Sequence, residues 1–137
     1  MAFKPIQYDE GKTVKLSFKS GETTTKHCAV VIDTTTGYYY TGAINAEDVR
    51  YIALEAVTTT SDGQLVLCLP VKGVRMICDT HDDPVRSDDV GTFVDLYNST
   101  TLDLTSNQDV FYVEDIYGVT TDKKVVGYFC PVRAGQD

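Results

Sequence analysis

The sequence predicts an all-β fold, a small β-barrel or β-sandwich of about 8–10 short strands with an extended N-terminal arm. Apolar and polar side chains alternate with a period of two in the clearest segment, Thr13–Lys19, which is typical of a half-buried strand. Glycine, asparagine and aspartate recur between such segments and favour tight turns. No stretch of the sequence carries the apolar periodicity of an amphipathic helix, so a helical fold class is excluded.

The expected elements follow one another along the chain. Residues 1–11 form an extended arm, because Pro5 disfavours a helix there, and residues 12–137 form a single β-barrel or sandwich domain. The expected strands are Thr13–Lys19, Cys28–Ile32, Tyr38–Thr41, Tyr51–Leu54, Leu65–Val71, Val74–Cys78, Thr92–Tyr97, Val110–Glu114 and Val125–Val132. Asp62-Gly63 is expected at the centre of a hairpin turn, and Asn45–Asp48 is the one place where a helical turn could start.

The second half of the chain repeats the order of strands and turns of the first half. Asp48–Ile52 aligns with Asp109–Val113 at an offset of 61 residues (109 − 48), and Pro70-Val71 then falls on Pro131-Val132 without a gap. Both stretches contain a strand, a threonine-rich turn, an apolar strand and a Pro-Val pair. Two similar β-modules would explain this repeat, and so would a chance similarity between two hairpins with the same patterning.

Length and charge limit the possible classes. The 137 residues suit one domain, and 42% hydrophobic with 23% charged residues is ordinary for a chain that builds its own core. The net charge of −8 and the scattered lysines and arginines argue against nucleic acid and anionic membranes as partners. No apolar run is long enough to span a bilayer, and no signal peptide is expected.

The four cysteines, Cys28, Cys68, Cys78 and Cys130, lie in or beside apolar segments. Two disulfides are one reading of an even cysteine count. Free cysteine is among the most buried residue types, and without an export signal an oxidising compartment is not expected. Reduced thiols in the core are therefore the prediction.

Two polar loops are expected, at Asp79–Asp89 and Asn98–Asp109. The segment Cys78–Asp83 in and before the first loop has the densest metal-binding chemistry, because it contains Cys78 and His81 among several aspartates. Its spacing matches neither a four-ligand zinc site nor a calcium loop of the Asp-x-Asp-x-Asp-Gly type. An acidic loop that faces water is the expectation, and cation binding by Cys78–Asp83 stays open.

The sequence offers little for catalysis. A nucleophile needs an oriented base, and His27 and His81 are the only histidines. A Gly-x-Ser-x-Gly elbow and a phosphate-cradling glycine loop are missing from the sequence. Glu114 and Asp115 are adjacent on an expected strand, so their carboxylates diverge. The chain is expected to be no enzyme and to bind no cofactor, with a small β-fold nucleotide hydrolase as the enzymatic alternative.

Candidate partner-binding residues are apolar and aromatic side chains in two places. They are Phe3, Pro5, Ile6, Tyr8, Tyr38, Tyr39 and Tyr40. The first four belong to the arm, which either frays or docks on a neighbouring subunit. The three tyrosines alternate between the faces of an expected strand, and they are either a rim of core rings or a contact surface of the kind that tyrosine favours.

The sequence resembles the small β-barrel head decoration (cement) proteins of tailed bacteriophages. The resemblance is spread over most of the chain and is carried by the N-terminal Met1–Pro5, by Val71–Arg75, by Asp89–Leu96 and by Val125–Phe129. It implies a homo-oligomer, with a trimer favoured, on the outside of the capsid of a virion made in the host cytoplasm. It further implies that Met1–Tyr8 threads over the major capsid protein or an adjacent decoration subunit.

The function expected from this resemblance is mechanical. A clip that spans several shell subunits adds buried area across their junctions and stabilises the capsid. Strand edges open to pairing with a partner would assist attachment, and deletion of residues 1–8 is expected to abolish attachment while the barrel stays folded. The alternatives are a phage tail or adaptor domain and a carbohydrate-binding module, for which Tyr38–Tyr40 is the candidate platform.

Overall fold

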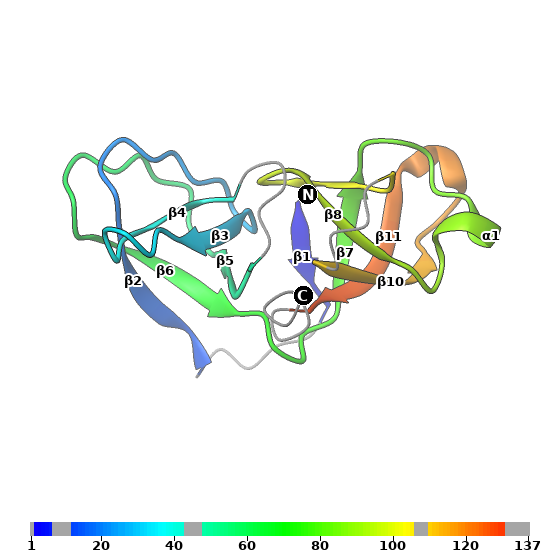
Figure 1. The fold of residues 1–137 in the computed structure, drawn as a ribbon, viewed down its shortest axis with the longest axis horizontal. Helices are drawn as coiled ribbons and strands as arrows, with labels where there is room; N and C mark the ends of the chain where they lie inside the picture. Colours follow the sequence, from blue (N-terminus) through cyan, green and yellow to red (C-terminus); the bar gives the residue numbers. More distant parts are fainter. Residues whose placement is uncertain (1, 7–11, 43–47, 106–109, 131–137) are drawn as a thin grey trace.

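The computed structural model describes residues 2–6, 12–42, 48–105 and 110–130, and it confirms the predicted all-β fold. The strands form two small closed barrels, which lie side by side along the longest axis of the molecule (Figure 1). Barrel 1 contains β2 (Val14–Phe18), β3 (Ala29–Ile32), β4 (Tyr39–Thr41), β5 (Tyr51–Ala53) and β6 (Gln64–Pro70). Barrel 2 contains β7 (Met76–Thr80), β8 (Phe93–Asn98), β9 (Thr101–Asp103), β10 (Phe111–Ile116) and β11 (Lys124–Phe129).

The short elements of barrel 2 differ from the expected loops. Helix α1 (Arg86–Asp89) lies in the predicted loop Asp79–Asp89, and β9 lies in the other predicted loop. A second helical element is the 3-10 helix η2 (Thr120–Asp122), between β10 and β11. Elements of three or four residues are too short to leave a periodic signal in the sequence. The helical turn considered at Asn45–Asp48 falls almost entirely outside the described residues. Among the helices that are described, none is long and apolar enough to cross a bilayer.

The described part of the predicted arm is built into the fold. Strand β1 (Phe3–Pro5) lies between the two barrels (Figure 1) and pairs antiparallel with β7, with Phe3 opposite Cys78. On the side of barrel 1, the Phe3 amide donates a hydrogen bond to the His27 carbonyl oxygen at 3.1 Å. Strand β1 therefore joins the two barrels instead of extending away from them.

Alternation along the strands decides which side chains fill each barrel. In β7 the first, third and fifth residues are buried, and in β11 the second, fourth and sixth are buried. Because successive side chains of a strand point to opposite faces, these residues face inward. The rings of Phe111 and Phe129 meet inside barrel 2 in a T-shaped contact, with centroids 5.1 Å apart.

The two barrels share a hydrophobic core. One cluster of buried side chains contains Ala29 and Ile52 from barrel 1 together with Leu96 and Phe111 from barrel 2. A smaller cluster around Phe18 fills barrel 1. The described chain is thus one compact unit, but the single barrel or sandwich predicted from the sequence is a pair of barrels packed on each other.

The barrels have the same topology and the same strand register. The order around barrel 1 is β2-β4-β3-β5-β6, the order around barrel 2 is β7-β9-β8-β10-β11, and β2–β4 and β7–β9 are the parallel pairs. Phe18 pairs with Tyr39 in barrel 1 as Thr80 pairs with Leu102 in barrel 2. Four further cross-strand pairs of barrel 1 have counterparts in barrel 2. The pair Ile32 and Tyr39 matches Leu96 and Leu102, Ala29 and Ile52 match Phe93 and Tyr112, Ile52 and Leu69 match Tyr112 and Tyr128, and Val14 and Cys68 match Met76 and Gly127. The structure therefore contains two equivalent β-modules.

Residues that occupy equivalent positions in the two barrels are not separated by the constant 61 positions of the gapless sequence alignment. Equivalent residues are between 59 positions apart (Val66 and Val125) and 64 positions apart (Val30 and Val94). An offset of 61 would match Ile52, which faces outward from barrel 1, with Val113, which faces into barrel 2. A shift of one residue exchanges the two faces of a strand, so the gapless alignment pairs the wrong faces here.

Asp79 attaches the N-terminal strand to barrel 2. Its Oδ2 accepts a hydrogen bond from the Ala2 amide at 3.1 Å, and its Oδ1 accepts one from Lys124 Nζ at 2.6 Å. Partial burial raises the pKa of Asp79, but the hydrogen bonds from Lys124 and from the Ala2 amide, together with the interaction with the positively charged N-terminus, leave the pKa below its ordinary value of 3.8.

We expect this carboxylate to stabilise the fold at neutral pH and to lose its effect in acid. Since the folded pKa is lowered, the stabilisation is complete above the unfolded value near 3.8 and disappears as the pH falls through the folded value. Asp79→Asn should lower the free energy of unfolding by about 1–2 kcal/mol at neutral pH and by much less near pH 2. Urea denaturation at both pH values measures this, with the exposed Asp83→Asn as control. Equal losses at the two pH values would contradict it.

Candidate functional site

The arm residues proposed to contact a partner are mostly part of the core. Phe3 and Pro5 are buried, and the Phe3 ring lies 4.9 Å from the Phe129 ring, centroid to centroid. Ile6 is exposed, and Tyr8 lies outside the described residues. The structure therefore corrects the prediction for Phe3 and Pro5, because an apolar side chain that fills its own barrel is not exposed for docking.

The three consecutive tyrosines divide between two environments, as side chains on a strand do. Tyr39 points into barrel 1, where its ring centroid lies 5.6 Å from that of Tyr51 and 6.4 Å from that of Phe18. Tyr40 packs against the core shared by the barrels, with the Lys19 ammonium group 4.6 Å from its ring centroid. All three tyrosines are half-buried. Tyr39 and Tyr40 each pack against a core cluster, and Tyr39 also lines a surface hollow.

This hollow, which we call the barrel-1 mouth, has a volume of about 160 Å³. It is lined by Val30, Val31, Ile32, Tyr39, Asp48, Arg50 and Tyr51. The charged pair is exposed, with Arg50 Nε 2.9 Å from Asp48 Oδ1. Rings beside a carboxylate suit a sugar, but pockets that enclose small ligands usually measure about 300–1,000 Å³. The mouth is large enough for one ring or for one or two side chains of a partner.

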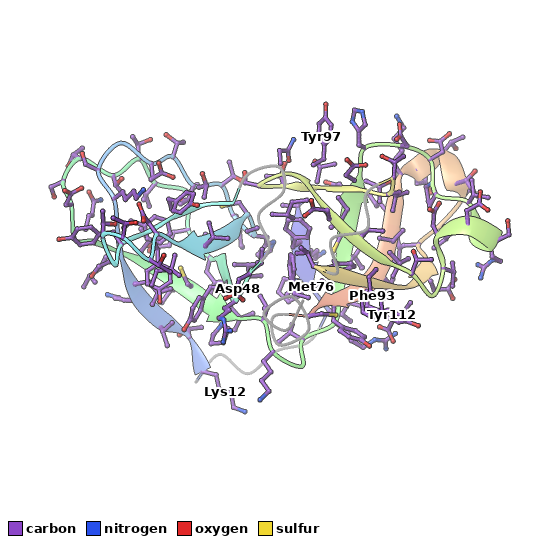
Figure 2. The ribbon with its side chains drawn as sticks, viewed as in Figure 1. Lys12, Asp48, Met76, Phe93, Tyr97 and Tyr112 are labelled. Carbon is purple, nitrogen blue, oxygen red and sulfur yellow. The ribbon has the colours of Figure 1, made fainter. Side chains whose placement is uncertain are left out.

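Barrel 2 carries a row of aromatic rings on its outer face, which we call the aromatic row. It consists of Phe93 on β8, Tyr112 on β10 and Tyr128 on β11. The ring centroids are 5.0 Å apart for Phe93 and Tyr112 and 5.3 Å apart for Tyr112 and Tyr128. Phe93 and Tyr112 lie on the lower side of barrel 2 in Figure 2. The three rings are half-buried, and such cross-strand pairs both stabilise a sheet and offer a contact surface.

Sequence reasoning missed this row because its members come from three different strands. Only the register of the sheet, with Tyr112 opposite both Phe93 and Tyr128, brings them together. Tyr112 and Tyr128 each lie between two buried neighbours, and Phe93 is the first residue of β8, before the buried Val94. The strand alternation indicated that each one faces outward, but nothing in the sequence indicated that they are neighbours.

A second apolar feature, the barrel-2 tip, consists of Val85, Tyr117 and Val119. These side chains are 47%, 46% and 64% exposed. The ion pair between Arg86 Nη2 and Asp115 Oδ1 (2.9 Å) ties the segment of Val85 to the strand that leads to Tyr117. The Val119 amide donates a hydrogen bond to the Asp122 side chain, which holds the turn in place. The tip therefore consists of exposed apolar side chains on two segments of barrel 2 that the ion pair connects.

The segment Cys78–Asp83 does not gather its candidate metal ligands. Cys78 faces into barrel 2 and is buried, whereas His81 is exposed and stacks on Tyr97 with a centroid distance of 3.9 Å. Asp79 is engaged with Ala2 and Lys124. In the described part of the chain, no three His, Cys, Asp or Glu side chains are grouped as metal ligands. Figure 2 shows Tyr97 pointing away from barrel 2 on the side opposite Phe93 and Tyr112.

The buried thiols are poor nucleophiles. Cys28, Cys68 and Cys78 are free and buried, as the composition predicts for core cysteines. Burial raises the pKa of all three, and for Cys68 the value is about 12. Because the thiolate is the reactive species, these three side chains are almost entirely unreactive at neutral pH. Their role is to fill the barrels.

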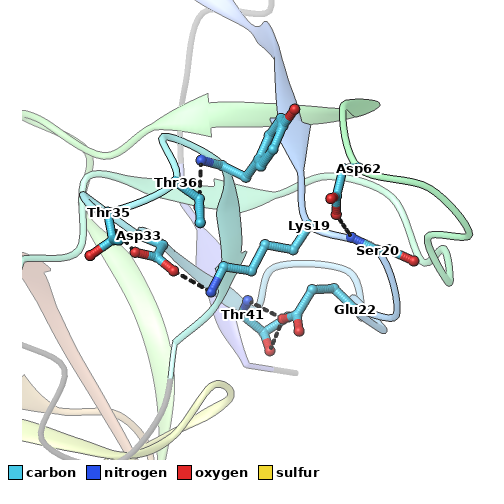
Figure 3. A network of polar contacts seen from close by, with 9 residues as sticks. Lys19, Ser20, Glu22, Asp33, Thr35, Thr36, Thr41 and Asp62 are labelled. Atoms are coloured by element: carbon cyan, nitrogen blue, oxygen red, sulfur yellow. Dashed lines mark hydrogen bonds and ion pairs between the residues drawn. The ribbon is translucent and has the colours of Figure 1, made fainter.

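A polar network joins the strands and turns of barrel 1 (Figure 3). Lys19 forms an ion pair with Asp33, and Glu22 Oε1 accepts hydrogen bonds from the amide and the hydroxyl of Thr41 at 2.8 and 3.2 Å. The Ser20 amide donates to Asp62 Oδ1 at 2.9 Å. The hydrogen bond with Asp33 is the main cause of the raised pKa of Lys19. Each polar group is used to hold a turn, so the network is structural.

These features define an all-β protein of two tandem, closed, five-stranded barrels with apolar and aromatic side chains at the surface in three places: the barrel-1 mouth, the aromatic row and the barrel-2 tip. No protein-family model matches the sequence, and no curated protein matches it.

Proposed function

We propose that this chain is a structural protein that binds the outside of a viral head shell and stabilises it by clamping neighbouring subunits. The proposal combines the resemblance to phage head decoration proteins with the exposed apolar barrel-2 tip, which is the observation that carries it. Two closed barrels with a common core make a body that resists deformation, which suits a mechanical clamp. The partner is the major capsid protein, and the chain acts as a homo-oligomer, with a trimer favoured.

The proposed contact uses side chains at the tip. A group of exposed apolar side chains on an ordered turn gains free energy when a partner removes it from water. Tyr117 adds a large ring whose ordering costs little entropy, a property of residues that dominate interfaces. Both barrels close on themselves, but β1 pairs as a strand with β7 alone, and β2 meets β4 through the single pair Phe18 and Tyr39. Pairing of a strand edge with a partner therefore stays a prediction.

The assembled shell is proposed to be the true binding partner. A site composed of several shell subunits exists only after assembly, so by mass action binding stabilises the assembled form over free subunits. The acidic chain, with a net charge of −8, would be repelled by the packaged nucleic acid and held on the exterior. This supports a position on the virion surface.

Substitutions at the tip should weaken attachment. We expect Tyr117→Ala combined with Val119→Asp to reduce binding by tenfold or more, roughly the effect of losing a hot-spot residue. The assay is co-sedimentation with capsid shells assembled from the major capsid protein that is the proposed partner. The matched control is Leu65→Asp, since Leu65 on β6 is similarly exposed (56%) but belongs to barrel 1. Equal binding by the tip variant and the control would contradict a tip contact, and no binding by the natural chain would refute the proposed function.

A carbohydrate-binding function is the second candidate, because the barrel-1 mouth places Tyr39 and Tyr51 beside the Asp48 carboxylate. Its small volume, about 160 Å³, limits the ligand to about one sugar ring and ranks this function below shell binding. A glycan array tests it, with Tyr39→Ala as the variant that should lose the signal. A tail or adaptor role would be indicated by co-sedimentation with tails instead of heads.

A further inference from the structure

The interface between the two barrels has two sides. Barrel 1 contributes the outer face of β3, β5 and β6, where Ala29, Ile52 and Leu69 are buried within the shared core. Barrel 2 contributes the inner residues at its open end, among them Leu96. The Ala29 amide donates a hydrogen bond to the Ser99 carbonyl oxygen of barrel 2 at 2.7 Å. The outer face of barrel 1 thus covers the open end of barrel 2.

The contact at Leu96 is close. A Cβ atom placed on Gly42 of barrel 1 would lie 3.1 Å from Leu96 Cδ1, which is tighter than an ordinary van der Waals contact. Strand β1 closes the remainder of this end of barrel 2, where the Phe3 ring approaches the Phe111 ring. Barrel 2 is therefore closed at this end by barrel 1 and β1 together.

The aromatic row is the counterpart of the covering face. By the matching registers, Ala29 corresponds to Phe93, Ile52 to Tyr112 and Leu69 to Tyr128. The barrel-1 residues are fully buried against barrel 2, whereas the three rings of barrel 2 are half-exposed. The face that barrel 1 uses to cover its neighbour is therefore present again on barrel 2, with larger side chains and with part of their surface open to solvent.

The barrel-1 mouth is the counterpart of the covered end. Leu96 corresponds to Ile32, Leu102 to Tyr39, and Phe111 to Tyr51. The barrel-2 residues are fully buried, but Ile32 is 39% exposed and the two tyrosines are half-buried. All three line the mouth of barrel 1. The end that is closed in barrel 2 is therefore an open hollow in barrel 1.

Charges appear where the covered interface is apolar. Val110 is buried in the shared core, and its counterpart Arg50 is exposed beside the mouth. Leu54 packs against the same core, and its counterpart in barrel 2 is Glu114, which follows Val113 as Leu54 follows Ala53. Glu114 Oε1 forms an ion pair with Arg75 Nε at 2.8 Å. Each surface thus carries an ion pair where the covered interface is apolar, Arg50 with Asp48 at the mouth and Glu114 with Arg75 beside the row, so neither surface adds a net charge that opposes contact.

We propose that the aromatic row of one copy of this chain docks on the barrel-1 mouth of a second copy. The contact repeats between molecules the packing that joins the two barrels within one molecule. It uses two different surfaces, so it is a head-to-tail contact that either closes into a ring or continues as a filament. The inference goes beyond the proposed function, because it names the contact between copies and holds whether or not the chain binds a shell.

Two single variants test the contact by sedimentation velocity on the purified full chain over a range of concentrations. We expect the natural chain to form oligomers, and we expect Ile32→Arg in the mouth and Tyr112→Arg in the row each to weaken assembly by roughly 30-fold or more. An equimolar mixture of the two variants should form a dimer and nothing larger. The Ile32→Arg chain keeps an intact row, and the Tyr112→Arg chain keeps an intact mouth.

The controls separate a lost contact from a lost fold. Leu65→Arg, outside both surfaces, should assemble like the natural chain, and all variants should keep its thermal unfolding midpoint. If Tyr112→Arg lowers that midpoint, Tyr128→Ala replaces it as the row variant. A monomeric natural chain, normal assembly of either variant, or a mixture that stays monomeric would each overturn the inference. These measurements include no capsid shell, so their outcome is independent of whether the proposed shell binding is correct.

Discussion

Replacing Phe3 with alanine is expected to lower the free energy of unfolding by about 3–5 kcal/mol, the usual cost of removing a buried phenylalanine ring. Phe3 is fully buried in the core that both barrels share. Its ring centroid lies 4.9 Å from that of Phe129 and 6.4 Å from that of Phe111, so its removal would leave a cavity between two aromatic rings. Since small proteins are stable by only about 5–15 kcal/mol, this is a large fraction of the total.

Urea denaturation measures this loss, and Ile6→Ala is the matched control. Ile6 belongs to the same N-terminal segment but is exposed, so its truncation should change stability by no more than about 0.5 kcal/mol. A loss below about 1 kcal/mol for Phe3→Ala would mean that the N-terminal segment is not packed on the barrels in solution. The prediction of an extended arm that docks on a neighbouring subunit would then hold. Deletion of residues 1–8 should destabilise the barrels for the same reason, so it cannot separate attachment from folding.

The fold class could be predicted from the sequence because alternation is a local property. The inward positions of β7, β10 and β11 are the ones at which apolar side chains recur, and the structure buries them. Strand β1 was missed because it lies in the predicted arm, and β9 because it lies in a polar loop; neither has the tyrosines that favour a strand in the equally short β4 and β5. Pro5 also argued for an arm, although its place at the end of β1 is one that a strand accepts.

The number of barrels could not be predicted from the same pattern. Closure depends on which strands pair, and pairs such as β2 with β6 or β7 with β11 join segments far apart in the chain. The repeat in the sequence pointed to two modules, but unequal connections shift the equivalent residues by different amounts. An alignment of Ile52 with Val113 exchanges the inner and outer faces, and a sequence read without pairing has no means of detecting that exchange.

The candidate surfaces could not be predicted either, because they too depend on which strands pair. The tyrosines at 38–40 drew attention because they are consecutive, yet consecutive strand residues point in alternate directions and cannot form one surface. The aromatic row does form one surface, because Phe93, Tyr112 and Tyr128 stand opposite one another on neighbouring strands. Its correspondence to the face of barrel 1 that covers barrel 2 follows from the matching registers of the two barrels.

Gly127→Ala is expected to be as damaging as the loss of Phe3, although it adds only one methyl group. Gly127 lies on β11 between β10 and β7, opposite Val113 and Met76. A Cβ atom here would collide with the carbonyl oxygen of Tyr112 and would lie 2.6 Å from Phe111 Cε1. The first obstacle is backbone and the second is a ring packed in the core, so neither can move away at low cost. We expect a loss of about 3 kcal/mol or more, measured by urea denaturation.

The equivalent position in barrel 1 supplies a matched control. It holds Cys68, whose side chain is buried inside the barrel, so the same site accommodates a Cβ and a sulfur atom there. The difference between the barrels coincides with a register shift in β10 after Val113, where an extra residue bends the strand. Cys68→Ala should therefore cost only about 1 kcal/mol, the scale of a small truncation in a core. If Gly127→Ala were no more destabilising than Cys68→Ala, then β10 does not approach β11 this closely, and the aromatic row, which depends on the same pairing of Tyr112 with Tyr128, would lose its geometric basis.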